Sequence, residues 1–157
     1  MYHVGDKIVY PMQGAGTIER IEKRKILGVV REYYILNVPC GAMGIMLPVD
    51  NCESIGIRPV VSREKLRHVM RVLGQESSKM PGNWNKRHRQ NMDKLKTGDI
   101  DIVAEIVRNL TRMDRDRKLS AGEKKMLTNA RRILLSEFML VEEIEEEETM
   151  MRIEKAI

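Results

Sequence analysis

Residues 44–74 read GIMLPVDNCESIGIRPVVSREKLRHVMRVLG, and the character of the chain changes within this stretch. Up to Gly56 it carries glycine or proline every few residues, as short strands joined by tight turns do. From Ser62 onward the apolar residues recur at the i, i+3, i+4, i+7 spacing of one helix face: Leu66, Val69, Met70 and Leu73. The chain therefore joins two kinds of structure near residue 60.

The part before residue 58 is predicted to be a small β module. It holds seven of the eleven glycines and three of the five prolines, and these separate four runs rich in β-branched and aromatic side chains. The runs predict strands over residues 7–10, 16–25, 30–38 and 44–49, with a hairpin turn at Gly28. So short a module fits a Tudor-like or SH3-like barrel better than a sandwich, which needs about 100 residues.

The part after residue 58 is predicted to be an all-α bundle. Side chains that cap helix N-termini precede three periodic apolar runs: Ser62, Asn83 and Ser120. A further helix is predicted to run from Asp99. Gly74 and Gly98 are predicted to end the first two helices. Ser120 and Glu123 form a capping box, in which we expect each side chain to bond the other residue's backbone amide. The fold class is therefore α+β multidomain, with an N-terminal small Tudor/SH3-like β-barrel followed by a C-terminal all-α helical bundle.

Three segments follow from these patterns. The β module takes residues 1–57 and the helical domain residues 58–141, whose first helix and connection occupy 58–82. Residues 142–157 form an acidic tail, because six of the seven residues from Glu142 to Glu148 are glutamate. Mutual repulsion predicts that this tail frays as a solvated helix end.

Composition limits the class of protein. With 157 residues, 42% of them hydrophobic and 32% charged, the chain has material for a core and is too short for a large multidomain enzyme. No apolar run is long enough for a membrane span, and the first residues do not have the layout of a signal peptide. We expect a soluble, cytoplasmic monomer without membrane contact.

No pattern indicates catalysis, a cofactor or a metal site. Cys40 and Cys52 are too far apart for a metal-binding pair, and the three histidines are scattered: His3, His68 and His88. Gly14-Ala15-Gly16 lacks the other residues of a phosphate loop and precedes a strand, so we interpret it as a turn or bulge. We expect two reduced thiols and no enzyme.

The positive charge is concentrated in the middle of the chain. The net charge of +5 arises from balances of 0 over residues 1–57, +8 over 58–98 and −3 over 99–157. A localised basic excess of this kind indicates an anionic partner.

Residues 84–91, WNKRHRQN, are the strongest candidate for contact with nucleic acid. They join the only tryptophan to Lys86, Arg87 and Arg89 at a helix start. Such cations neutralise phosphates, and an exposed indole can stack on a base or wedge between base pairs. The alternative is that Trp84 anchors the helix to the core while the cations form a solvated face.

Two further basic sites have alternative interpretations. The Lys23-Arg24-Lys25 run ends a predicted strand at a hairpin, where charge either protects against aggregation or contacts a partner. Lys124 and Lys125 lie beside the first turn of a predicted helix, which suits either an anion or a simple capped surface.

Several separated motifs resemble the CarD/CdnL-like family of bacterial transcription regulators. They are VGDKIVYPMQGAGTIERIEKRKI and EYYIL in the β module, and NWNKRHRQNMDKLKTGD, VAEIVRNL and RDRKLSAGEKKML in the helical part. The resemblance runs from about Val4 to Val141 and leaves out the acidic tail.

This resemblance implies that the β module is a Tudor-like RNA polymerase interaction domain, of the kind also found in the transcription-repair coupling factor. Its implied target is the β subunit of the polymerase. Arg24 matches a basic residue of the family's polymerase-binding face. Met46 takes the place of a second one, which is an arginine in some members.

The resemblance further implies that the helical part contacts promoter DNA at the upstream edge of the transcription bubble. Trp84 matches the family's minor-groove wedge. Lys86, Arg87 and Arg89 match the basic positions around it, and Lys124 matches a more distant basic contact. Because the minor groove distinguishes base pairs poorly, binding should be largely independent of sequence.

Together these expectations describe a regulator of transcription initiation, located on the bacterial nucleoid, that stabilises the open promoter complex. The alternative is a protein adaptor on RNA polymerase that makes no direct contact with DNA.

Overall fold

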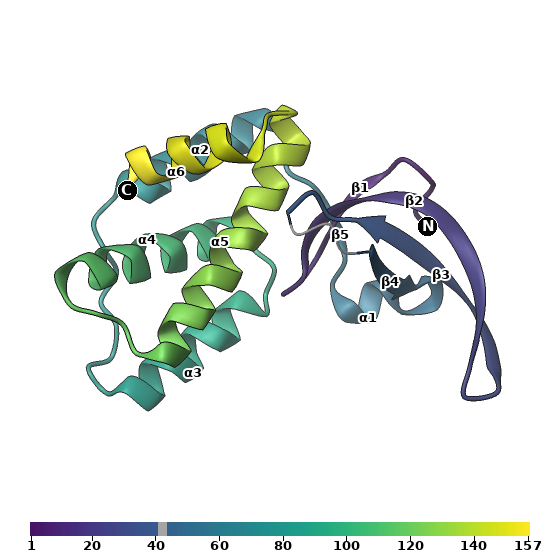
Figure 1. Cartoon of the computed structure of the whole chain (residues 1–157), viewed down its shortest axis with the longest axis horizontal. Helices are drawn as coiled ribbons and strands as arrows, with labels where there is room; N and C mark the ends of the chain where they lie inside the picture. Colours follow the sequence, from purple (N-terminus) through teal and green to yellow (C-terminus); the bar gives the residue numbers. More distant parts are fainter. Residues whose placement is uncertain (41–43) are drawn as a thin grey trace.

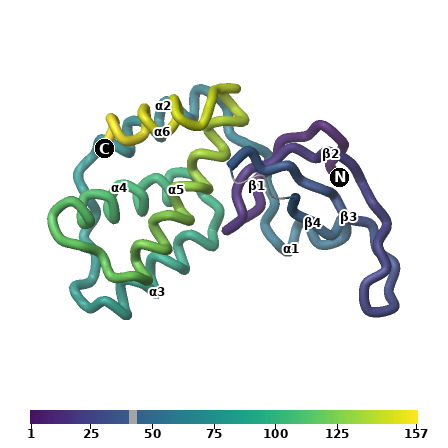
Figure 2. The backbone as a smooth tube through the Cα atoms, in the orientation of Figure 1, coloured from purple at the N-terminus to yellow at the C-terminus, as the bar shows by residue number. Residues whose placement is uncertain are grey.

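The computed structural model describes residues 1–40 and 44–157, arranged as a β module beside a helical module (Figure 1). The N-terminus lies on the β module and the C-terminus on the far side of the helical module (Figure 2). None of the helices in these two ranges combines the length and the apolar character that a membrane crossing requires.

Five antiparallel strands form one sheet: β1 Lys7–Tyr10, β2 Gly14–Ile26, β3 Val29–Asn37, β4 Gly44–Pro48 and β5 Arg58–Pro59. Their order is β4-β3-β2-β1-β5, so β4 and β5 are the edges. The four predicted strands are confirmed, whereas β5 spans two residues and has no signal of its own in the sequence. The small β module is thus present as an antiparallel sheet, and its closure into a barrel stays a prediction.

The strands β2 and β3 form a long hairpin that projects beyond the rest of the sheet (Figure 1). Ile26 pairs with Val29 across the turn, and Leu27 and Gly28 have φ angles of 52° and 80°. Two consecutive positive φ angles characterise a type I′ turn, whose twist suits a two-residue hairpin. The predicted turn at Gly28 is confirmed.

A small apolar core lies on one face of the sheet: Ile8, Ile18, Tyr34, Leu36 and Leu47. A 3-10 turn (η1, Val49–Asn51) and a one-turn helix (α1, Cys52–Ile55) pack against it. α1 ends at Gly56, whose φ of 88° is readily adopted only by glycine. Neither element was predicted, because a single turn gives no helical periodicity in the sequence.

The second module contains five helices in the described residues: α2 Arg63–Gly74, α3 Trp84–Leu95, α4 Ile100–Asp116, α5 Ala121–Glu142 and α6 Glu146–Ala156. The three predicted N-caps are confirmed, because each side chain accepts a backbone N–H from its own helix: Ser62, Asn83 and Ser120. Asp99, from which the third helix was predicted to run, caps α4 in the same way. The apolar stripes of α2, α4 and α5 meet in one core that includes Leu66, Leu73, Val107, Leu110 and Leu134.

The acidic C-terminal segment is folded, and the expectation of a frayed tail is wrong. Glu143 ends α5 with a φ of 55°, and α6 then runs back along α2 (Figure 1). Thr149 and Ile153, four residues apart on one helix face, are each 1% exposed. Arg152 pairs with Glu142 at 2.8 Å and offsets part of the repulsion. Burial of one helix face therefore outweighs the repulsion between glutamates.

Candidate nucleic-acid interface

Trp84 is the first residue of α3 and lies half-exposed on the surface of the helical module. The residue is 42% exposed. Its indole stacks on the ring of His88, with centroids 5.3 Å apart and planes 19° apart. The indole N–H donates to Ser120 Oγ at 2.6 Å. Polar and stacking contacts thus hold the ring in place while part of it stays accessible.

Gly122, in the first turn of α5, gives the indole room. A Cβ at this position would lie 3.1 Å from Trp84 Cζ2, which is shorter than an ordinary carbon–carbon contact. The start of α5 therefore supports one edge of the ring. Of the two interpretations of Trp84, core anchor or exposed ring, the structure shows an anchored ring at the surface.

Arg87 is buried beneath this surface, which corrects the expectation that it presents a free charge to DNA. Its side chain is 7% exposed, and Nε and Nη2 each donate to a carboxylate oxygen of Glu123 at 2.8 Å. Nη1 donates to the carbonyl oxygens of Pro81 and Gly82. Arg87 thereby ties α3 and the loop before it to α5.

The Arg87–Glu123 pair also changes the predicted capping box. The Glu123 amide donates to Ser120 Oγ at 3.3 Å as predicted, but the Glu123 carboxylate bonds Arg87. These hydrogen bonds hold the pKa of Glu123 below its ordinary value, and Glu123 in turn raises the pKa of Arg87. Both groups therefore stay ionised at neutral pH.

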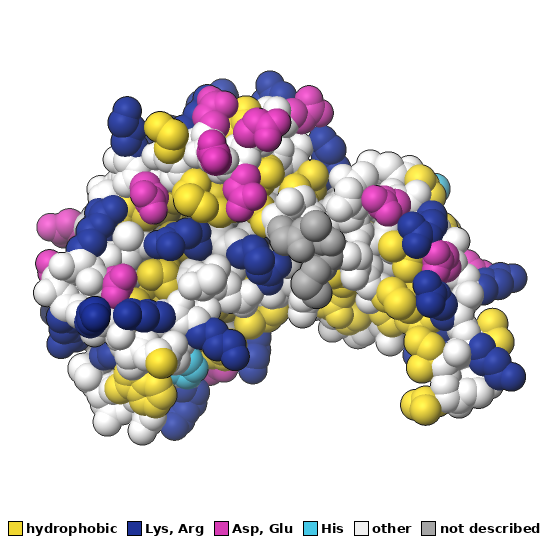
Figure 3. Space-filling model, in the orientation of Figure 1, with side chains coloured by type: hydrophobic (Ala, Val, Ile, Leu, Met, Phe, Trp, Pro, Cys, Tyr) yellow, Lys and Arg dark blue, Asp and Glu magenta, His cyan; other side chains and the backbone are white. Residues whose placement is uncertain are grey.

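Three of the predicted DNA-contacting cations remain on the surface near Trp84. Lys86 and Arg89 lie on α3 and Lys124 on α5, and all three are exposed. Within residues 1–40 and 44–157, none of the three forms an ion pair. A shallow groove runs along α3 from Trp84 past Arg89 to Lys96. Figure 3 shows basic side chains beside an apolar cluster in this region.

Part of the basic excess of residues 58–98 is not available to a partner. Arg58, Arg87 and Lys65 each pair with a carboxylate on a later helix. Arg67 and Arg71 are exposed, but they lie on α2 and not on α3. The charge that can meet an anion beside Trp84 is therefore smaller than composition suggests.

Arg24 and Met46 share one face of the sheet. Arg20 pairs with Ile35, and Ile35 pairs with Met46, so these three side chains point to the same side. Arg24 lies four residues along β2 from Arg20 and points to that side as well. The structure thus brings the two predicted polymerase-binding residues to one surface.

This outer face of the sheet is apolar toward the hairpin turn. Ile26 and Val29 lie on it with exposed fractions of 46% and 53%, and Met46 is 36% exposed. Arg24 bonds Glu22 at 2.8 Å within the face. Glu22 also pairs with Arg20 on this face. Exposed aliphatic side chains around such an ion-paired cluster suit contact with a protein better than contact with phosphates.

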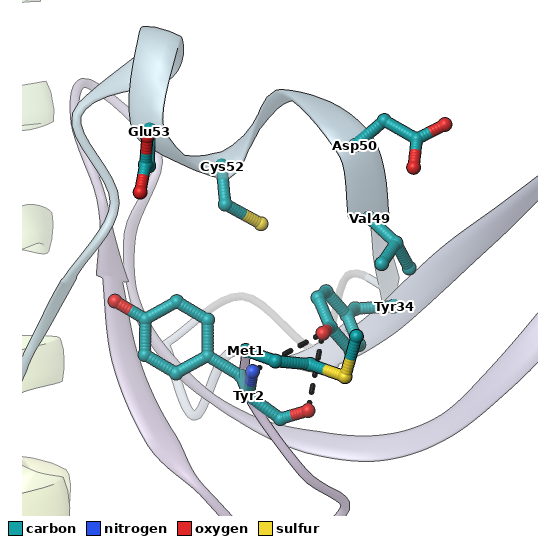
Figure 4. Close-up of a pocket in the computed structure, with 7 residues that line it drawn as sticks. All are labelled: Met1, Tyr2, Tyr34, Val49, Asp50, Cys52 and Glu53. Atoms are coloured by element: carbon teal, nitrogen blue, oxygen red, sulfur yellow. Dashed lines mark hydrogen bonds between the residues drawn. The ribbon is translucent and has the colours of Figure 1, made fainter.

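A separate pocket lies in the β module, between the N-terminus and the η1–α1 segment (Figure 4). Tyr34 Oη donates to the Tyr2 carbonyl at 3.1 Å and accepts the Tyr2 amide at 3.2 Å. Asp50, Cys52 and Glu53 lie on its other side. In the described ranges no cluster of three or more potential ligands forms a metal site. The two hydrogen bonds between Tyr2 and Tyr34 therefore attach the N-terminal residues to the sheet.

Two family comparisons cover almost the whole chain. Residues 2–61 match the CarD-like/TRCF RID domain, and residues 68–154 match the CarD C-terminal domain. The second match includes most of α6, so the resemblance extends beyond Val141, where the motifs alone had placed its end. A protein of Bacillus subtilis (strain 168) named "Putative transcription factor YdeB" is 40% identical over 148 residues, which are 94% of this chain and 97% of that protein.

Proposed function

The chain belongs to the CarD-like family of transcription regulators, and from this premise we propose that it binds the β subunit of RNA polymerase and promoter DNA together. In this proposal it contacts DNA at the upstream edge of the transcription bubble and thereby stabilises the open complex. It acts by binding and carries out no chemical reaction.

The anchored, half-exposed ring of Trp84 is the observation that supports DNA contact most strongly. A ring that enters the minor groove must be accessible, and it must also be fixed so that little freedom is lost on binding. Ser120, His88 and Gly122 fix the ring from one side. Lys86 and Arg89 flank it with unpaired charge that suits phosphates.

The outer face of the hairpin supports docking on a protein. It combines Arg24 and Met46 with the exposed Ile26 and Val29, and it lies on the module that matches the RID domain. We assign this face to the β subunit. Arg24 supplies the charge and the aliphatic side chains supply the area that leaves water on binding.

Two weak contacts are enough for this mechanism. Once the β module is docked, the helical module binds DNA intramolecularly, so its effective concentration is high. A ring that binds opened DNA and not the closed duplex stabilises the open state by its difference in affinity, and about 1.4 kcal/mol shifts the equilibrium tenfold.

The test is the lifetime of the open complex formed by the cognate holoenzyme, with and without the protein. We expect the wild-type chain to lengthen it and Trp84→Ala to lose most of this effect with little change in melting temperature, because the ring lies at the surface. Met151→Ala, which removes a 67% exposed apolar side chain on α6, is the matched control and should behave as wild type.

The polymerase contact is tested separately by charge reversal. Arg24→Glu should weaken binding to the β subunit by about tenfold, since it places a second anion beside Glu22. Lys25→Glu is the matched control, because neighbouring residues of a strand point to opposite faces.

If the wild-type chain binds polymerase without any change in open-complex lifetime, the wedge is refuted and an adaptor without DNA contact is the better account.

A further inference from the structure

The side chain of Arg58 bridges the β module to two helices. Arg58 lies in β5, and its Nη1 and Nη2 each donate to a carboxylate oxygen of Glu137 on α5 at 2.8 Å. Nε and Nη2 also donate to the carbonyl of Gly98, just beyond the end of α3, at 3.0 and 2.9 Å. Nη1 additionally donates to the Pro59 carbonyl at 3.0 Å. Every N–H of the guanidinium is therefore used.

Glu137 is the centre of this junction. Its side chain is 3% exposed, although it carries a charge. Besides Arg58, it accepts the backbone N–H of Val61 at 2.9 Å, in the three-residue connection between β5 and α2. One buried carboxylate thus bonds both β5 and the connection from β5 to α2. A buried charge of this kind is stable only while its partners stay in place.

A second anchor joins the β1–β2 turn and the start of β2 to α5. The Ala15 amide donates to Ser136 Oγ at 2.8 Å, and a Cβ on Gly14 would lie only 2.9 Å from the same oxygen. The Arg132 side chain donates to the Gln13 carbonyl at 2.7 Å. The modules are therefore joined at two separate points, and we expect that one of them alone does not fix their relative orientation.

The helical core also extends into the β module. Cys40, which follows β3, is 4% exposed and belongs to the apolar core of the helices, where its Sγ contacts Met139 at 3.3 Å. Met12 of the β1–β2 turn packs against the same core. The boundary between the modules is thus a packed interface and not a flexible linker.

We propose that Glu137 is a positioning residue that makes the two modules one rigid body, so that docking of the hairpin face on polymerase sets where Trp84 meets DNA. Glu137 orients Arg58, and Arg58 bonds the carbonyl of Gly98 in the turn that follows α3, whose first residue is Trp84. This inference rests on the proposed function, and it adds that the geometry between the two contacts is part of the mechanism.

The test uses the full chain with the conservative variants Glu137→Gln and Arg58→Lys. The first removes the charge and keeps the size, and the second keeps the charge and loses the bonds to Gly98. The control is Glu148→Gln, which breaks an exposed pair with Arg152 inside the helical module. Nitrogen-15 relaxation on each full chain reports whether the modules tumble with one correlation time, and open-complex lifetime reports function.

We expect the wild-type chain and Glu148→Gln to show a single correlation time for both modules. Glu137→Gln should show two correlation times, one for each module. Its affinity for the β subunit should stay within about twofold of the wild-type value. The effective concentration of the Trp84 ring at DNA should fall about tenfold. The lifetime extension should fall accordingly. If Glu137→Gln fails to fold, the correlation times and the open-complex lifetime of Arg58→Lys test the inference instead.

A folded variant that loses the pair and keeps both a single correlation time and the wild-type lifetime would overturn the inference. Separate tumbling with an unchanged lifetime would overturn it too, because rigidity would then be irrelevant to function. If the wild-type chain itself does not lengthen the lifetime, the proposed function fails instead, and the relaxation data still report on the junction.

Discussion

Removal of the Glu123 carboxylate should destabilise the helical module more than removal of any exposed carboxylate. Glu123→Ala leaves the Arg87 guanidinium buried without its counter-charge, and breaking such a pair costs about 3–5 kcal/mol. Arg87 keeps its bonds to the carbonyls of Pro81 and Gly82, so we expect a value near the lower end of this range. For a chain of this length, about 3 kcal/mol corresponds to a fall of about 10 °C in melting temperature.

Denaturant titration followed by circular dichroism measures this loss directly. Glu148→Ala is the control, because its partner Arg152 and the Glu148 side chain are both about half exposed and such pairs contribute roughly 0–1 kcal/mol. A loss below about 1 kcal/mol for Glu123→Ala would show that the pair is not the buried anchor described above.

The same pair sets a pH dependence with a defined sign. Because Arg87 lowers the pKa of Glu123 in the folded chain, the stabilisation is complete above the ordinary carboxyl value of 4.5 and is lost as the pH falls through the folded pKa. The difference in unfolding free energy between wild type and Glu123→Gln should therefore shrink under acid. A difference that is constant from neutral pH to strong acid would contradict this assignment.

Two further predictions concern the ring and the buried thiol. Gly122→Ala places a methyl group 3.1 Å from the Trp84 ring, so we expect a shift in tryptophan fluorescence and a shorter open-complex lifetime, whereas an unchanged spectrum would show that the ring does not rest on Gly122. Burial raises the pKa of Cys40 to about 11, so its thiol should resist alkylation at neutral pH until denaturant is added. Mass spectrometry of the alkylated peptides, with the half-buried Cys52 as internal reference, checks this, and rapid native labelling of Cys40 would refute its burial.

Local chemistry explains what the sequence could predict. The caps at Ser62, Asn83 and Ser120 act within one turn, and the hairpin turn at Gly28 depends on two residues, so the neighbouring residues alone are enough to predict each. The strand positions follow from the spacing of glycine and proline for the same reason.

The rest depends on contacts between residues far apart in the chain. Arg87 looks like one more cation in a basic run, and only the approach of α5 shows that Glu123 neutralises it. The acidic run was expected to be a solvated tail because six of its seven residues are glutamate, whereas the two buried residues of this segment, Thr149 and Ile153, come after it. Charge counted along a sequence therefore overestimates the charge that a partner can meet.

The Arg58–Glu137 pair constrains how this chain can diverge. The two positions lie in modules that match separate domains, and each residue is the other's counter-charge, with the carboxylate buried and the guanidinium partly buried. A substitution at one position removes the counter-charge of the other, so we expect each single change to cost stability that a matching change at the second position restores. A β module of this kind that is joined to other helices would lack the Glu137 carboxylate, so an arginine at this position would there need a different counter-charge.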